Sequence, residues 1–116
     1  MPRKTASVMY GNLDLIIMHT LHKTGPSHGL GLIDAIEAGS EGAMRVEDGA
    51  PYRALHRLEA DGFLEAEWRI SDKNRKAKFY ALTSSGEAEL KRAQREWQRH
   101  TEVVSKVLGV GWGTSK

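Results

Sequence analysis

The strongest constraint on the fold is a change in the spacing of apolar residues along the chain. Over residues 64–70 apolar and charged side chains alternate, which is typical of a half-buried strand. Turn-forming residues occupy 71–74, and a second strand is predicted over 76–82. Before and after this region the apolar residues recur at helical spacing. The sequence therefore predicts a mainly α-helical protein with one small β-hairpin.

The alternation also divides the side chains of each strand between two faces. In the first strand the apolar face consists of Leu64, Ala66, Trp68 and Ile70. We therefore expect Trp68 to pack against the core. In the second strand one face has Ala77, Phe79 and Ala81, and the other has Lys76 and Lys78.

Three helices are predicted before the hairpin. The first, over 11–23, is apolar on more than one side and needs partners on two sides. Gly25 and Pro26 end it, Ser27 is a candidate N-cap, and a second helix extends to about residue 39. A short strand is predicted at 44–46. The third helix spans about 49–61, with Pro51 in its first turn. The buried stripes of the second and third helices are predicted to be Leu30, Ile33 and Ile36, and Tyr52, Leu55 and Leu58.

A fourth, long helix follows the hairpin, from a Thr83 N-cap to about residue 108. Its apolar stripe has a coiled-coil spacing and consists of Leu90, Ala93, Trp97, His100, Val104 and Val107. One small domain cannot bury this stripe together with the apolar first helix, so we predict a homodimer. The expected dimerisation residues are Leu13, Ile16, Ile17, Leu90, Ala93, Trp97, Val104 and Val107.

Length and composition limit the remaining possibilities. A chain of 116 residues should fold around one core. The sequence has no cysteine and no apolar run long enough to span a bilayer, so a cytoplasmic protein without a membrane partner is expected. The predicted organisation is a basic flexible arm (1–10), a DNA-binding domain (11–82), a dimerisation helix (83–108) and a flexible tail (109–116).

Positive charge is concentrated in the hairpin. The net charge of the whole chain is +2, whereas residues 69–78 contain five lysines and arginines and one aspartate. A local basic cluster of this kind is typical of a contact with a polyanion. Three helices followed by a cationic hairpin is also the element order of a winged helix-turn-helix, in which the third helix enters the major groove of double-stranded DNA.

Six motifs resemble the PadR family of transcriptional regulators. They are 11–15 (Gly-Asn-Leu-Asp-Leu), 25–29 (Gly-Pro-Ser-His-Gly), 45–49 (Arg-Val-Glu-Asp-Gly), 52–59 (Tyr-Arg-Ala-Leu-His-Arg-Leu-Glu), 61–64 (Asp-Gly-Phe-Leu) and 80–86 (Tyr-Ala-Leu-Thr-Ser-Ser-Gly). The resemblance covers about 11–108 and implies a homodimeric winged-helix regulator, usually a repressor, of the short subfamily with a single C-terminal dimerisation helix. It also suggests a flat aromatic effector between the subunits, for which we expect Leu13, Ile17 and Trp97 as contacts.

The DNA-binding residues are expected at the start of the second helix, on the third helix and in the hairpin. They are Ser27, His28, Tyr52, Arg53, His56, Arg57, Lys73, Asn74, Arg75, Lys76 and Lys78. Ala50 stands where relatives commonly have a serine that clamps the DNA backbone. Arg53 can replace that contact, because arginine reaches a phosphate or a guanine edge.

The sequence offers less support for two other classes of function. His19 and His22 have a spacing that could bind a metal, but no third ligand converges on them in the sequence, so no metal or cofactor is predicted. No phosphate loop, nucleophile with a partner base, or carboxylate pair indicates an enzyme. The remaining alternative is a dimeric small-molecule-binding or protein-interaction module that kept the winged-helix scaffold without binding an operator.

Overall fold

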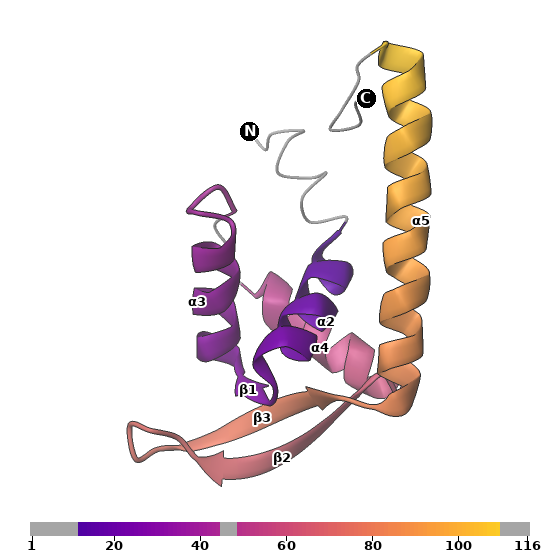
Figure 1. Cartoon of the computed structure of the whole chain (residues 1–116). Helices are drawn as coiled ribbons and strands as arrows, with labels where there is room; N and C mark the ends of the chain where they lie inside the picture. The colour runs from indigo at the N-terminus through magenta and orange to yellow at the C-terminus, as the bar shows by residue number, and fades with distance from the viewer. Residues whose placement is uncertain (1–11, 45–48, 110–116) are drawn as a thin grey trace.

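The computed structural model describes residues 12–44 and 49–109. Figure 1 shows helices α2 (Leu13–Thr24), α3 (Gly29–Gly39), α4 (Ala50–Ala60) and α5 (Ser84–Leu108) above a small sheet of β1 (Ser27–His28), β2 (Leu64–Ile70) and β3 (Lys76–Leu82). The predicted mainly helical fold with one hairpin is confirmed. Within the described part of the chain, none of the helices is long and apolar enough to cross a membrane.

Some predictions fall on residues that the structure does not describe. The N-terminal arm and residues 110–116 of the tail lie outside the described ranges, as do residues 45 and 46 of the predicted short strand. The remaining residue of that strand, Met44, is not in a strand and is buried in the core. Its burial explains the apolar signal that suggested a strand there.

Helix α2 lies at the centre of the molecule. It packs against α3, α4, α5 and β3, and Ile17 has no exposed surface. Leu13 and Leu90 are only 4% and 3% exposed within the subunit. These side chains fill the subunit's own core, which argues against the predicted partner contacts of Leu13, Ile17 and Leu90 and the predicted effector contacts of Leu13 and Ile17.

The start of α3 differs from the prediction because of a strand that the sequence analysis missed. Residues Ser27 and His28 form β1 and pair with Tyr80 and Phe79 of β3. Ser27 is thus in a strand, and His28 is the N-cap, accepting a hydrogen bond from the Gly31 N–H at 3.2 Å. The buried side chains of α3 are Leu32 and Ile36, whereas Leu30 is exposed.

The pairing of β2 with β3 keeps the predicted division of the second strand into two faces and decides which of them Trp68 shares. Trp68 lies opposite Lys78, and Ile70 lies opposite Lys76. Directly paired residues share a face of a sheet, so the two lysines lie on the face of Trp68 and Ile70. The buried residue of β3 is Tyr80, and the opposite face has Ala77, Phe79 and Ala81. The five-residue connection 71–75 sets this register, and a one-residue shift would exchange the faces.

Trp68 also departs from its predicted place in the core. The shared face is buried where Leu64 and Tyr80 pack against the helices, but the hairpin continues past them (Figure 1). At that point Trp68 is 61% exposed and Ile70 is 64% exposed. Alternation identified the face correctly, but it did not show where along the strands the core ends.

The junction between the sheet and α5 is closely packed. The Thr83 hydroxyl accepts a hydrogen bond from the Gly86 N–H at 3.0 Å, which confirms Thr83 as the N-cap, and it donates one to the Gly62 carbonyl at 2.7 Å. A Cβ atom at Gly86 would lie 2.1 Å from the Phe63 carbonyl oxygen. Only glycine allows the first turn of α5 to approach this backbone so closely.

We predict that Gly86→Ala destabilises the protein by about 1–3 kcal/mol, because the added methyl overpacks the junction. Ser85→Ala is the matched control, since Ser85 is exposed in the same helical turn and its loss should change stability by less than about 0.5 kcal/mol. Urea unfolding followed by circular dichroism measures both free energies. Equal stability of the two variants would contradict the packing argument.

Candidate nucleic-acid interface

Helix α4 presents a polar face to solvent. Its buried side consists of Pro51, Ala54, Leu55 and Leu58. Arg53 and His56, three residues apart, lie together on the opposite, exposed side. Because α3 and α4 follow one another and pack together, they form a helix-turn-helix whose second helix is open to a ligand. The two side chains are placed as the sequence predicted.

Tyr52 lies beside the start of α3. A Cβ atom at Gly29 would be 2.6 Å from Cε1 of Tyr52 and 3.2 Å from its hydroxyl oxygen. Tyr52 is not one of the buried residues of α4, although the sequence analysis placed it on the apolar side of this helix. Its hydroxyl is close to the N-terminus of α3, where backbone N–H groups favour an anion.

Two of the predicted DNA-binding cations are paired with carboxylates inside the subunit. Arg57 on α4 donates a hydrogen bond to Asp14 on α2. Lys78 on β3 donates one to Glu59 on α4, with Nζ 3.1 Å from Oε1. The hydrogen bond to Glu59 raises the pKa of Lys78 by favouring its charged ammonium form. Each carboxylate offsets part of the positive charge that its partner offers to a phosphate.

The remaining predicted cations lie at the tip of the hairpin 64–82, which we call the wing. Lys73, Asn74, Arg75 and Lys76 are all exposed. The turn is closed by a hydrogen bond from the Ser71 N–H to the Arg75 carbonyl at 2.7 Å, and Asn74 adopts a positive φ of 59°. The wing extends away from the helical body in Figure 1, so these charges are open to a large partner.

Ser27 and His28 have local structural roles in this fold. The Ser27 hydroxyl donates to the Gly25 carbonyl at 3.1 Å. The His28 ring caps α3 and meets the Phe79 ring edge to face, with the ring centroids 5.1 Å apart. These contacts hold β1 and the start of α3 against β3, and both residues are half-buried.

The wing also contains Arg69 and Trp68, which the sequence analysis did not predict as DNA-binding residues. Arg69 lies on the opposite face of the wing from Trp68, 5.0 Å from the Phe79 ring centroid, and pairs with Glu67. Trp68 lies beside Lys76, whose Nζ is 5.8 Å from its ring centroid. The signal for the exposure of Trp68 was the length of the connection between the strands. Its five residues pair Trp68 with Lys78 and not with a core residue.

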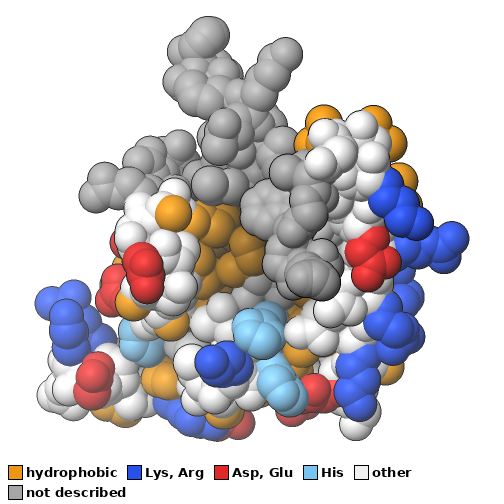
Figure 2. Space-filling view, turned by 45° about the horizontal axis from the view of Figure 1, so that its top comes forward, with side chains coloured by type: hydrophobic (Ala, Val, Ile, Leu, Met, Phe, Trp, Pro, Cys, Tyr) orange, Lys and Arg blue, Asp and Glu red, His pale blue; other side chains and the backbone are white. Residues whose placement is uncertain are grey.

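An open groove of about 1000 Å³ lies between α2, α3 and α5. Figure 2 shows hydrophobic side chains deep between α3 and α5. Ile16 and Trp97, both predicted to contact a partner, line this groove together with Leu15. Further along α5, Val104 and Val107 are exposed, and Ala93 is half-buried.

Polar contacts join α2 to α5 beside this groove. Nδ1 of His22 lies 3.0 Å from Oε1 of Glu87, and Nδ1 of His19 lies 3.3 Å from the Gln94 side-chain nitrogen. The two histidines thus contact different residues of α5. The spacing of the two histidines thus has a structural explanation, because both side chains help to hold α5 against α2.

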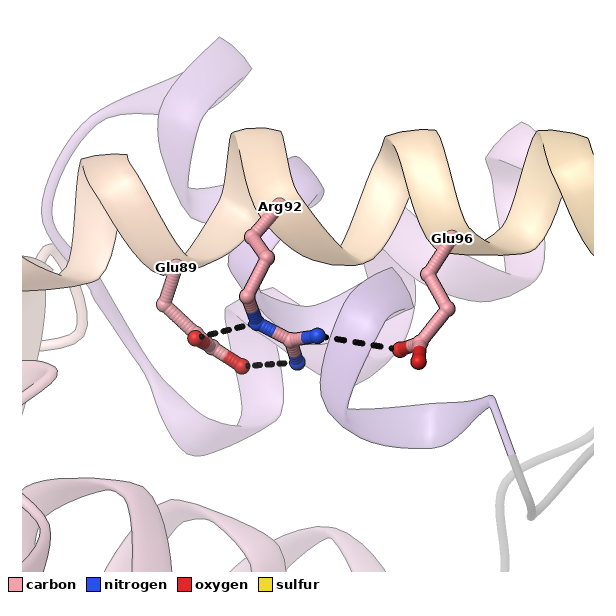
Figure 3. Close-up of polar contacts among 3 residues, drawn as sticks. All are labelled: Glu89, Arg92 and Glu96. Atoms are coloured by element: carbon pink, nitrogen blue, oxygen red, sulfur yellow. Dashed lines mark hydrogen bonds and ion pairs between the residues drawn. The ribbon is translucent and has the colours of Figure 1, made fainter.

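On the solvent side of α5 a single arginine joins two carboxylates (Figure 3). Arg92 donates to Glu89 at 2.9 and 2.7 Å and to Glu96 at 3.1 Å. The hydrogen bond from Arg92 lowers the pKa of Glu89, whereas both carboxylates raise the pKa of Arg92. The contribution of Glu89 to stability is present near neutral pH and is lost as the pH falls through its lowered pKa.

A helix-turn-helix with an exposed second helix, followed by a cationic hairpin, defines a winged-helix DNA-binding protein. The chain belongs to the transcriptional regulator PadR-like family, whose model matches residues 17–92. It is 36% identical over 94 residues to transcriptional regulator Rv3488 of Mycobacterium tuberculosis, covering 79% of this chain and 81% of that protein. The resemblance predicted from the sequence motifs is therefore confirmed.

Solved structures agree with this assignment. A transcriptional regulator from Clostridium thermocellum superposes with a TM-score of 0.78 at 25% identity, covering 86% of this chain and 96% of that one. A PadR-like transcription factor from Bacteroides fragilis gives a TM-score of 0.70 at 28% identity, covering 89% and 96%. The protein is thus a DNA-binding regulator of transcription and not an enzyme.

We predict that Glu59→Gln tightens DNA binding, because it releases Lys78 to contact a phosphate. A plot of log affinity against log salt concentration should become steeper by up to about one unit. Glu65→Gln is the matched control, since it removes the same charge from an exposed position on β2. Fluorescence anisotropy with labelled duplex DNA provides the measurement. Equal changes in both variants would show that net charge, and not the release of Lys78, is responsible.

Proposed function

We propose that this protein is a homodimeric repressor that binds a two-fold-symmetric operator. The observation that supports it best is the exposed Arg53 and His56 pair on α4, which lies in the same domain as the cationic tip of the wing. Helix α4 is suited to contact the edges of the bases, and the wing tip is suited to contact the phosphate backbone. In this proposal residues 11–82 read the DNA and residues 83–108 join the subunits.

The groove between α2, α3 and α5 supports the dimer. Its lining includes Leu15, Ile16 and Trp97, while the exposed Val104 and Val107 continue the apolar side of α5. The α5 helix of a second copy supplies matching apolar side chains at coiled-coil spacing. Burial of both apolar surfaces by two-fold symmetry removes them from water, which favours association.

The proposed dimer places one α4 helix in each of two successive major grooves. The centres of the two half-sites are then about 34 Å apart. The wings reach the flanking phosphates or the minor groove, and the Tyr52 hydroxyl is beside the α3 N-terminus to bind a backbone phosphate. Because such a regulator must meet the chromosome, the proposal also places it in the cytoplasm.

An aromatic effector is the remaining part of the proposal. The groove supplies an indole at Trp97 and aliphatic side chains at Leu15 and Ile16, which is a suitable surface for a flat ring between two subunits. The partner's α5 helix competes for this surface. An effector therefore regulates DNA binding only if it prefers the subunit spacing that does not match the operator.

We predict that the protein sediments as a dimer at micromolar concentration and that Trp97→Glu yields a folded 12.9 kDa monomer. The reason is that burying a charge opposite the partner's apolar helix costs several kcal/mol. Arg99→Glu is the control, because Arg99 is exposed. It follows Trp97 by two residues and therefore lies on the other side of the helix. A monomeric wild type with native circular dichroism would contradict the dimer.

We predict that alanine at Lys73, Arg75, Lys76 and Lys78 weakens binding to all DNA sequences and flattens the salt dependence by roughly one unit per lost phosphate contact. Arg53→Ala should instead change sequence preference. Fragments selected from the source genome, measured at several salt concentrations, test both effects, with Arg99→Ala on α5 as the control. Failure of the wild type to bind any fragment would favour the interaction module without an operator.

A further inference from the structure

The wing has an apolar surface that the charges of the interface do not explain. Trp68 and Ile70 lie two residues apart on one face of β2 and are 61% and 64% exposed. Neighbouring exposed apolar side chains bordered by polar residues are typical of an interaction site, whereas isolated ones are common on any protein surface. Neither residue is part of the groove where we propose that the second subunit binds.

This surface lies on the same side of the sheet as the helices. Leu64 and Tyr80 share its face and are buried against the helical body. Lys78, which pairs directly with Trp68, bonds to Glu59 of α4. The exposed part of the face is therefore continuous with the side of the molecule on which α4 lies, so one duplex can meet both elements.

Positive charge surrounds the two apolar side chains. Lys76 is the direct pairing partner of Ile70 and holds its ammonium group 5.8 Å from the Trp68 ring centroid. Lys73 and Arg75 are exposed at the adjoining turn. An apolar patch bordered by cations matches the minor groove of DNA, where apolar deoxyribose walls lie between rows of phosphates.

We propose that Trp68 and Ile70 pack against deoxyribose in the minor groove while Lys76 contacts the neighbouring phosphate. The inference rests on the proposed function and assigns an apolar DNA contact to the wing. Lys76 leaves the indole ring for the phosphate, which exposes the ring face to the sugars. The energy of this contact comes from burial of apolar surface, so it does not depend on counterion release.

The test compares Trp68→Ala with wild type in DNA-binding titrations at four or more salt concentrations. Trp68→Ala should lower affinity about tenfold at every concentration, giving a parallel line in the log–log plot. Lys76→Ala should instead flatten the slope. Trp68→Phe is the control, because it keeps an aromatic ring at the same position of β2 and should retain most of the affinity.

A spectroscopic measurement reports the contact directly. In a Trp97→Phe, Trp112→Phe variant the only tryptophan is Trp68. Its emission should shift to the blue on addition of duplex DNA, because the indole leaves water. The thermal unfolding of Trp68→Ala should match wild type, which confirms that the exposed side chain is not needed for folding.

The outcomes separate this inference from the proposed function. Wild-type affinity of Trp68→Ala at every salt concentration, with no spectral shift, overturns the apolar contact and leaves the regulator intact. A flatter slope in Trp68→Ala also overturns it, because the indole would then act only by positioning Lys76. If the wild type binds no duplex DNA, the proposed function itself fails.

Discussion

The structure depends on the burial of α2. Ile17 of α2 and Leu55 of α4 have no exposed surface, and α2 packs against α3, α4, α5 and β3. Apolar burial of a residue of this size contributes on the order of 1.5–3 kcal/mol. Because α4 is held by its inward side chains, Arg53 and His56 on its outer side face solvent. Helix α2 also holds α5 in place, through the contacts of His22 and His19 beside the groove.

Carboxylates then decide which cations remain available. Asp14 holds Arg57, Glu59 holds Lys78, and the carboxylates of Glu89 and Glu96 both hold Arg92. Among the residues that the structure describes, neither Arg53 on α4 nor the exposed cations at the wing tip form an ion pair with a carboxylate. Their common property is position, since they lie where a duplex can reach both the helix and the hairpin.

The long helix α5 has two sides with different purposes. On one side Arg92 pairs with Glu89 and Glu96. Ion pairs at this spacing are typical of an exposed helical surface and stabilise the helix. On the other side Trp97 lines the groove beside α2. Because Leu90 already belongs to the subunit core, the apolar stripe passes from intramolecular packing to a surface suited to a partner.

The sequence by itself determined the order of elements, the position of the wing, the Thr83 cap and the polar face of α4. These depend on local spacing and capping, which neighbouring residues encode. Tertiary structure decided that Leu13 and Ile17 lie in the core, that Lys78 shares a face with Trp68, and that His28 caps α3 beside a short strand. Periodicity identifies the apolar side of an element, but strand register and the limit of the core depend on contacts between residues distant in the chain, so only the folded molecule determines them.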